Sequence, residues 1–338
     1  MKSAPVVSAN FFERIAQPTS RFHSDYLAYR RGRITRAGLI ARLPHIAMIG
    51  DSVCMDFHIS GAANTFWRAR TCRGKNWFLD VDPTSGIQSV SKQLEALTPF
   101  VVMEYAGVGA MVDDERERES FFRRILGTHN FSRQIRHLLA ERRFPDLILL
   151  AIGHNNVDWA WHCPANELEQ PEERLREQSQ RFRANFEQQL RRLVERACVQ
   201  RHRVAVIVYG LVNFEAYFKG RELAEQLRTS DSALYPHLET TYKYFTSFRP
   251  QHRHNLVRLA TMINEELRAT VSALDCELAH DPVLQVRYSD ALARADLSRV
   301  ELLHAVDGWH PSPKGHNVLG QAAFSAFAPS LEFLGIGT

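Results

Sequence analysis

The sequence predicts an α/β fold in which a mostly parallel sheet is covered by helices on both faces. Short apolar runs without polar alternation recur along the chain, as expected of strands that are buried on both faces. Longer charged segments with helical spacing separate these runs. Strands that alternate with helices in this way are typical of a doubly wound parallel sheet.

Four apolar runs are the predicted strands, and each ends in a glycine or leads into a loop of small residues. They are residues 45–49 (HIAMI), 100–103 (FVVM), 146–152 (DLILLAI) and 204–209 (VAVIVY). Residues 276–279 are the candidate for a fifth strand, although this run is short.

Helices are predicted from apolar residues that recur every third or fourth position. Residues 171–201 show this spacing most clearly, and residues 255–273 form a second long candidate. Ser312 followed by Pro313 is typical of an N-cap with proline at the first helical position. A final helix is therefore predicted to begin after Ser312.

We expect a single domain over residues 1–338, because α/β folds of this size often form one unit. Two parts exceed a minimal α/β pattern: an Arg-rich helical extension at residues 1–44 and an aromatic-rich insertion at residues 211–254. The insertion follows the fourth predicted strand. Its rings either cover a site at the end of that strand or form a small core under a helical insertion.

The composition is that of an ordinary globular protein, with 45% hydrophobic and 24% charged residues. A formal net charge of +4 gives no argument for nucleic acid or an anionic membrane as partner. The five cysteines include no Cys-x-x-Cys pair and the sequence has no His-Glu-x-x-His motif, so neither a metal nor another cofactor is expected. No apolar stretch approaches the ~20 residues of a membrane span and no signal peptide is recognisable, so a cytoplasmic location is expected.

Gly50-Asp51-Ser52 stands at the end of the first predicted strand. Ligands of doubly wound sheets bind at the carboxyl ends of the strands, and a serine in a glycine turn there exposes its hydroxyl. So short a motif also marks ordinary turns, and Asp51 or Ser52 would equally serve as a helix N-cap. The position of Ser52 nevertheless makes it a candidate nucleophile.

Asp307 and His310 stand just ahead of the last predicted helix. A serine hydroxyl is a weak nucleophile and needs an adjacent base, which His310 can supply. Asp307 can accept from Nδ1–H of His310 and so fix its tautomer. The alternative is a solvated aspartate and a structural histidine, in a chain that has 15 histidines.

Two later loops offer hydrogen-bond donors for a developing oxyanion. Residues 105–110 (YAGVGA) follow the second strand, where a glycine N–H can donate. Residues 153–156 (GHNN) follow the third strand, where an asparagine amide can donate. Glycine and asparagine are also the commonest turn residues, so each loop alone is a weak signal.

In this order, the four blocks resemble the SGNH (GDSL-type) hydrolase family. The matches are G-D-S at residues 50–52, Gly109 in the second block, G-x-N at residues 153–155 and D-x-x-H at residues 307–310. The sequence departs from the family pattern at three places, with Val53 for leucine, Glu104 for asparagine and Asn156 for aspartate. The resemblance implies a three-layer α/β/α flavodoxin-like fold with a mostly parallel sheet.

The resemblance also implies roles for individual residues. Ser52 would be the nucleophile, His310 the base and Asp307 the residue that orients it. The oxyanion hole would consist of the N–H groups of Ser52 and Gly109 and the side chain of Asn155. The choice of Gly109 over Gly107 depends on the alignment of the second block.

The predicted function is hydrolysis of carboxylic esters with acetyl or other short acyl groups, through an acyl-enzyme on Ser52. The ester substrate would be a small molecule, a carbohydrate or a lipid. Two alternatives remain: an acyltransferase in which an alcohol replaces water, and a non-catalytic binding module on the same fold. The α/β-hydrolase fold is not favoured, because no serine stands in a Gly-x-Ser-x-Gly motif.

Overall fold

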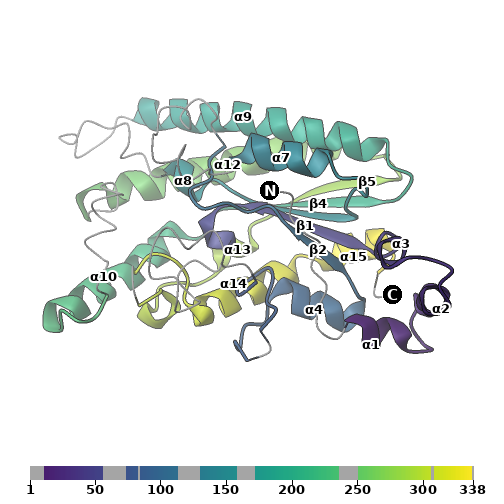
Figure 1. Ribbon diagram of the computed structural model, residues 1–338. Helices are drawn as coiled ribbons and strands as arrows, with labels where there is room; N and C mark the ends of the chain where they lie inside the picture. Colours follow the sequence, from purple (N-terminus) through teal and green to yellow (C-terminus); the bar gives the residue numbers. More distant parts are fainter. Residues whose placement is uncertain are drawn as a thin grey trace.

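A five-stranded sheet with helices on both faces forms the centre of the molecule (Figure 1). The computed structural model describes residues 11–55, 74–82, 84–112, 130–157, 172–235, 250–305 and 308–336. The strands are β1 (His45–Gly50), β2 (Val101–Glu104), β3 (Leu147–Ala151), β4 (Val204–Tyr209) and β5 (Leu284–Ser289). Their order is β2-β1-β3-β4-β5 and every neighbouring pair is parallel. This is the flavodoxin-like order, so the predicted fold class is confirmed.

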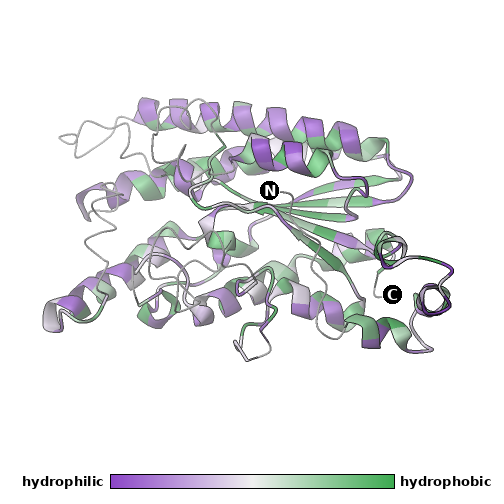
Figure 2. Cartoon of the chain, in the orientation of Figure 1, coloured by the Kyte–Doolittle hydropathy of each residue, from purple (hydrophilic) through white to green (hydrophobic). Residues whose placement is uncertain are grey.

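The helices form two layers, one above and one below the sheet in Figure 1. The upper layer contains α7 (Phe131–Leu139), α9 (Glu172–Cys198) and α12 (Arg253–Glu277). The lower layer contains α4 (Val90–Leu97), α10 (Phe214–Ser230), α13 (Ala291–Arg294), α14 (Pro313–Ser325) and α15 (Ala328–Leu334). Figure 2 shows that the strands are largely hydrophobic and that α9 carries many hydrophilic residues. The main core therefore lies between the sheet and each helix layer.

The four predicted main strands are confirmed, whereas the fifth was placed wrongly. Cys276 and Glu277 are the last residues of α12 and Leu278 is its C-cap, because the helical spacing continues through the buried Val271 and Leu274. The fifth strand is Leu284–Ser289, at the edge of the sheet. Its residues alternate between more and less buried positions, whereas β1 and β4 are buried throughout.

Three short helices precede β1 in residues 11–44, the described part of the predicted N-terminal extension. They are α1 (Phe11–Ala16), α2 (His23–Arg30) and α3 (Arg36–Ile40). Buried side chains in and beside these helices form a small apolar cluster with Val101 at the start of β2, made up of Phe11, Ile15, Phe22, Leu39 and Leu43. The described part of the extension is thus attached to the edge of the sheet that β2 forms.

The described half of the aromatic-rich segment is the helix α10, which packs into the main core. Phe214, Tyr217 and Phe218 are buried, and their ring centroids lie 5.8, 4.5 and 6.3 Å from that of Trp309. Trp309 directly precedes His310. The rings of α10 therefore support the loop that carries His310, while residues 236–249 lie outside the described residues.

Short elements connect the larger ones. They are η1 (Ser52–Cys54), α8 (His154–Val157), η4 (Pro250–His252) and η5 (Val300–Leu302). Within the described ranges, no helix combines the length and the apolar character needed to cross a membrane.

Candidate active site

The strand order of the sheet reverses direction at β1. From β1 the chain continues to β2 on one side, and it later returns to β3 on the other side. The loops that follow β1 and β3 therefore diverge, which is where doubly wound proteins bind ligands. The loops after β1, β2 and β3 carry Ser52, Gly109 and Asn155, respectively.

Ser52 and His310 meet at this edge, although 258 positions separate them in the sequence. The distance from Oγ of Ser52 to Nε2 of His310 is 3.0 Å, within hydrogen-bonding range. Both residues are largely buried, with exposed fractions of 6% and 5%. A hydroxyl and an imidazole in this arrangement can exchange a proton.

Backbone contacts hold the loop of His310 in place. The carbonyl oxygen of His310 accepts from the N–H of His304 at 2.8 Å, and the N–H of Ser312 donates to the carbonyl oxygen of Leu302 at 2.8 Å. Ser312 is the N-cap of α14, as predicted, and its hydroxyl accepts from the N–H of Gly315 at 3.2 Å. His310 is therefore held just ahead of the first turn of α14.

Asp307 lies outside the described residues, so its contact with His310 stays a prediction. The next residue, Gly308, is described, and its carbonyl oxygen accepts from Nη1 of Arg221 at 3.3 Å. Arg221 is fully buried on α10. The helix α10 thus holds the Asp307–His310 loop by a hydrogen bond as well as by its aromatic rings.

Asp51 ties the ends of β1 and β3 together. Its side chain is fully buried, and its Oδ1 accepts from the N–H of Val53 at 3.1 Å. Its Oδ2 accepts from the N–H of Gly153 at 3.3 Å, the N–H of His154 at 3.2 Å and Nδ1 of His154 at 2.9 Å. Sequence reasoning considered Asp51 only as a cap and gave His154 no role, because contacts across about a hundred residues leave no local signal.

Two glycines allow this close approach of the strand ends. A Cβ on Gly50 would lie 2.5 Å from Sγ of Cys54 and 2.7 Å from the carbonyl oxygen of Ala151. Gly153 has a φ of +126°, a conformation that residues with a side chain rarely adopt. The two turns therefore require glycine for steric reasons.

The loop after β2 lies against α8 and against the end of β1. Gly107 has its N–H bonded to the carbonyl oxygen of Gly50 at 3.1 Å, so of the two glycines only Gly109 stays a candidate oxyanion donor. Nδ2 of Asn155 donates to the carbonyl oxygen of Ala110 at 3.0 Å. An amide nitrogen carries two hydrogens, so a second one remains for another acceptor.

Trp77 supports the serine turn from the side of α14. Its Nε1 donates to the carbonyl oxygen of Val53 at 3.1 Å, and its backbone N–H donates to Nδ1 of His316 at 3.3 Å. His316 is fully buried on α14. Burial, followed by the nearby His310 and His304, lowers the pKa of His316 to about 3, so this imidazole stays neutral.

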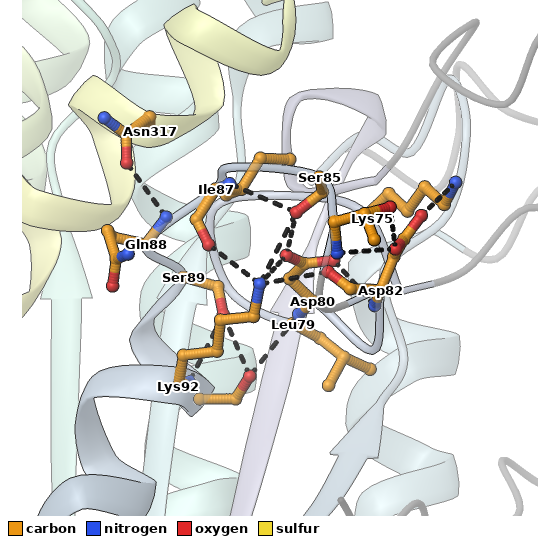
Figure 3. Close-up of polar contacts among 12 residues, drawn as sticks. Lys75, Leu79, Asp80, Asp82, Ser85, Ile87, Gln88, Ser89, Lys92 and Asn317 are labelled. Atoms are coloured by element: carbon orange, nitrogen blue, oxygen red, sulfur yellow. Dashed lines mark hydrogen bonds and ion pairs between the residues drawn. The ribbon is translucent and has the colours of Figure 1, made fainter. Parts of the chain in front are cut away.

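The loop that carries Trp77 is itself braced by a polar cluster (Figure 3). Lys92 forms an ion pair with the buried Asp80, and its Nζ also donates to the carbonyl oxygen of Ile87 at 3.2 Å. Gln88 donates its N–H to Oδ1 of Asn317 at 2.9 Å, which links the loop to α14. In the part of the chain that the structure describes, no three His, Cys, Asp or Glu side chains are grouped so as to hold a metal ion.

The structure thus combines a parallel sheet in flavodoxin-like order with a serine and a histidine in contact at its carboxyl edge. The chain belongs to the GDSL-like lipase/acylhydrolase family, whose family model matches residues 46–323. Membership in this family supports hydrolysis of ester bonds in general. None of the curated proteins compared with the chain matches it significantly.

Solved structures of two lipases are similar to this chain. The lipase/acylhydrolase from Enterococcus faecalis is 17% identical, with a TM-score of 0.38, over 84% of this chain and 95% of its own. The lipase Lip_vut3 from a goat rumen metagenome is 14% identical, with a TM-score of 0.43, over 84% of this chain and 97% of its own.

Proposed function

We propose that the protein hydrolyses carboxylic esters through an acyl-enzyme on Ser52. The observation that carries this proposal is the 3.0 Å contact between Oγ of Ser52 and Nε2 of His310 at the carboxyl edge of the sheet. As Oγ attacks the ester carbonyl, Nε2 takes its proton and then passes it to the leaving alcohol. His310 next activates a water molecule, which releases the acid and regenerates Ser52.

Three donors would stabilise the oxyanion that forms in each step: the N–H groups of Ser52 and Gly109 and Nδ2 of Asn155. The bond from Asn155 to the loop after β2 supports this assignment, because it fixes Nδ2 and leaves its second hydrogen for the substrate. The N–H of Gly107 already donates to the carbonyl oxygen of Gly50, which supports the choice of Gly109 as oxyanion donor. Donors held in place before the reaction cost no reorganisation when charge develops.

Asp307 would accept from Nδ1 of His310. Because Nε2 of His310 faces Ser52 as a base, its proton in the reactive tautomer is on Nδ1. That N–H needs an acceptor in a buried loop, and Asp307 stands three residues earlier in the chain. Its carboxylate would orient the ring and stabilise the imidazolium that forms.

We expect an ester with a short acyl group, from acetyl to about butyryl, whose alcohol is a small molecule, a carbohydrate or a lipid. The aromatic segment 211–254 leaves the carboxyl end of β4. If the rings of Tyr242, Tyr244 and Phe245, which lie outside the described residues, narrow the acyl pocket, each methylene should add up to ~0.8 kcal/mol until the pocket ends. Rates on nitrophenyl esters of increasing chain length, alongside acetylated sugars, would show this limit.

The direct test compares hydrolysis by wild type, Ser52→Ala and His310→Ala. Both variants should lose ~10⁴–10⁶ of the rate, as serine triads do when one member is removed. Ser325→Ala is the matched control, because it removes an exposed serine hydroxyl from the far end of α14, where Oγ donates to the carbonyl oxygen of Ala322. Substantial activity in purified Ser52→Ala would contradict the proposal. Product analysis with an added alcohol separates hydrolysis from acyl transfer.

A further inference from the structure

His154 lies where three parts of the site meet. It is the first residue of α8, directly before Asn155, and only 3% of its surface is exposed. Nδ1 lies 2.9 Å from Oδ2 of Asp51, and Nε2 lies 3.3 Å from the backbone nitrogen of Val212. The ring stacks on Phe214 with a centroid distance of 6.3 Å and an interplanar angle of 24°.

These contacts define the protonation of the ring. The N–H of Val212 can only donate, so Nε2 must present a lone pair to it. The single proton of a neutral imidazole is then on Nδ1, where it donates to Asp51. The ring is thereby fixed at both nitrogens and is neutral next to a buried carboxylate.

The bond to Asp51 is the shortest of the three contacts at Oδ2. The other two come from the N–H groups of Gly153 and His154, at 3.3 and 3.2 Å. The other oxygen of Asp51 holds the N–H of Val53, in the turn that contains Ser52. Without the Nδ1 bond, Asp51 would be joined to the turn before Asn155 by these two longer bonds alone.

We propose that His154 is a positioning residue that sets the distance between the nucleophile and the oxyanion donor. This proposal rests on the function proposed above for Ser52 and Asn155. His154 is hydrogen-bonded to Asp51, which holds the turn that contains Ser52. Asn155 directly follows His154 in the chain, so the position of His154 also fixes that of Asn155. Through Val212 and Phe214 it also reaches α10, whose rings support Trp309 beside His310. The donation from Nδ1 to Asp51 is the contact that matters most for the rate.

Two substitutions of His154 each keep one of the two hydrogen bonds of the imidazole and remove the other. His154→Asn places an amide nitrogen where Nδ1 lies, so it keeps the donor to Asp51 but does not reach Val212. His154→Gln extends to the place of Nε2, so it accepts from Val212 but leaves Asp51 without the donor. We expect kcat of His154→Asn within about 3-fold of wild type and kcat of His154→Gln lower by about 30- to 100-fold, because small misplacements of reacting groups cost that much. KM should change little in either variant.

His45→Gln is the matched structural control. His45 is also a buried histidine, but it lies at the amino end of β1, away from the site, where its Nδ1 is 2.8 Å from the carbonyl oxygen of Leu43. This variant should lower the melting temperature and leave kcat unchanged. Equal kcat for the Asn and Gln variants of His154, or a change in KM alone, would overturn the positioning role. Wild-type activity that does not depend on Ser52 would instead overturn the proposed function.

A measurement on the unmodified protein covers the case in which a variant does not fold. The ¹⁵N NMR shifts of the His154 ring distinguish a protonated nitrogen from one with a lone pair. We expect a protonated Nδ1 and an unprotonated Nε2. A proton on Nε2 would show that the ring does not donate to Asp51, and would overturn the proposal.

Discussion

Asn155 and Asn156 are adjacent and carry the same side chain, but one donates a hydrogen bond and the other accepts one. Both lie on α8, with exposed fractions of 9% and 8%, and both are bonded to the loop after β2 at 3.0 Å. Asn155 donates through Nδ2 to the carbonyl oxygen of Ala110, whereas Asn156 accepts through Oδ1 from the N–H of Val112. Alanine at either position removes one buried hydrogen bond, which should cost about 1–3 kcal/mol of the free energy of unfolding.

The two variants should differ in catalysis. Loss of an oxyanion donor typically lowers kcat by ~10²–10³, or about 3–4 kcal/mol in the transition state, so Asn155→Ala should show this loss with KM within a few-fold of wild type. Asn156→Ala should lose comparable stability and keep most of kcat. Asn155→Asp should be slower than Asn155→Ala, because a carboxylate repels the developing oxyanion.

Urea denaturation gives the two free energies of unfolding, and steady-state hydrolysis of a nitrophenyl acetate ester gives kcat and KM. If Asn155→Ala and Asn156→Ala lost kcat equally, the loss would reflect the shared loop and not an oxyanion donor. If Asn155→Ala changed KM alone, Asn155 would bind the substrate without stabilising the transition state.

Two further predictions concern stability. The pKa of His316 is lowered to about 3 by burial, so only the unfolded chain takes up this proton as the pH falls through the usual value of 6.5. The free energy of unfolding should then fall by up to about 1.4 kcal/mol per pH unit across that window. His316→Asn should show a shallower decline between about pH 6 and about pH 4 in urea titrations, and an unchanged slope would contradict the assignment. Gly50→Ala should cost more than about 1–3 kcal/mol, because its Cβ would clash with both Cys54 and Ala151. Adding Cys54→Ala should restore only part of this loss in melting temperature, since the carbonyl oxygen of Ala151 remains, and full recovery would contradict the steric account.

The central strands were predictable because burial on both faces leaves a continuous apolar run. β1 and β4 have no exposed position, and their sequences show no alternation. The edge strand β5 has one covered face, and its mixed sequence resembles an ordinary surface segment. Residues 276–279 instead contain the end of α12 and its C-cap, Leu278. Long-range packing decides whether such a segment becomes an edge strand or the end of a helix, and a local sequence pattern does not contain that information.

The site was predictable to the extent that it follows from strand ends. Ser52, Gly109 and Asn155 each stand in a loop after a predicted strand, and parallel strands bring such loops to one edge. The contacts of Asp51 with His154 were not predictable, because they depend on where backbone N–H groups point in two distant turns. The role of Asp307 stays a prediction.

The central claim is that Ser52 is a nucleophile activated by His310. A fluorophosphonate probe reacts with an activated serine, and peptide mass spectrometry locates the adduct. We predict one adduct, on Ser52, in wild type, and a strongly reduced rate of labelling in His310→Ala, because the Ser52 hydroxyl then lacks its base. An unlabelled Ser52 in folded wild-type protein, or equally fast labelling without His310, would contradict the account.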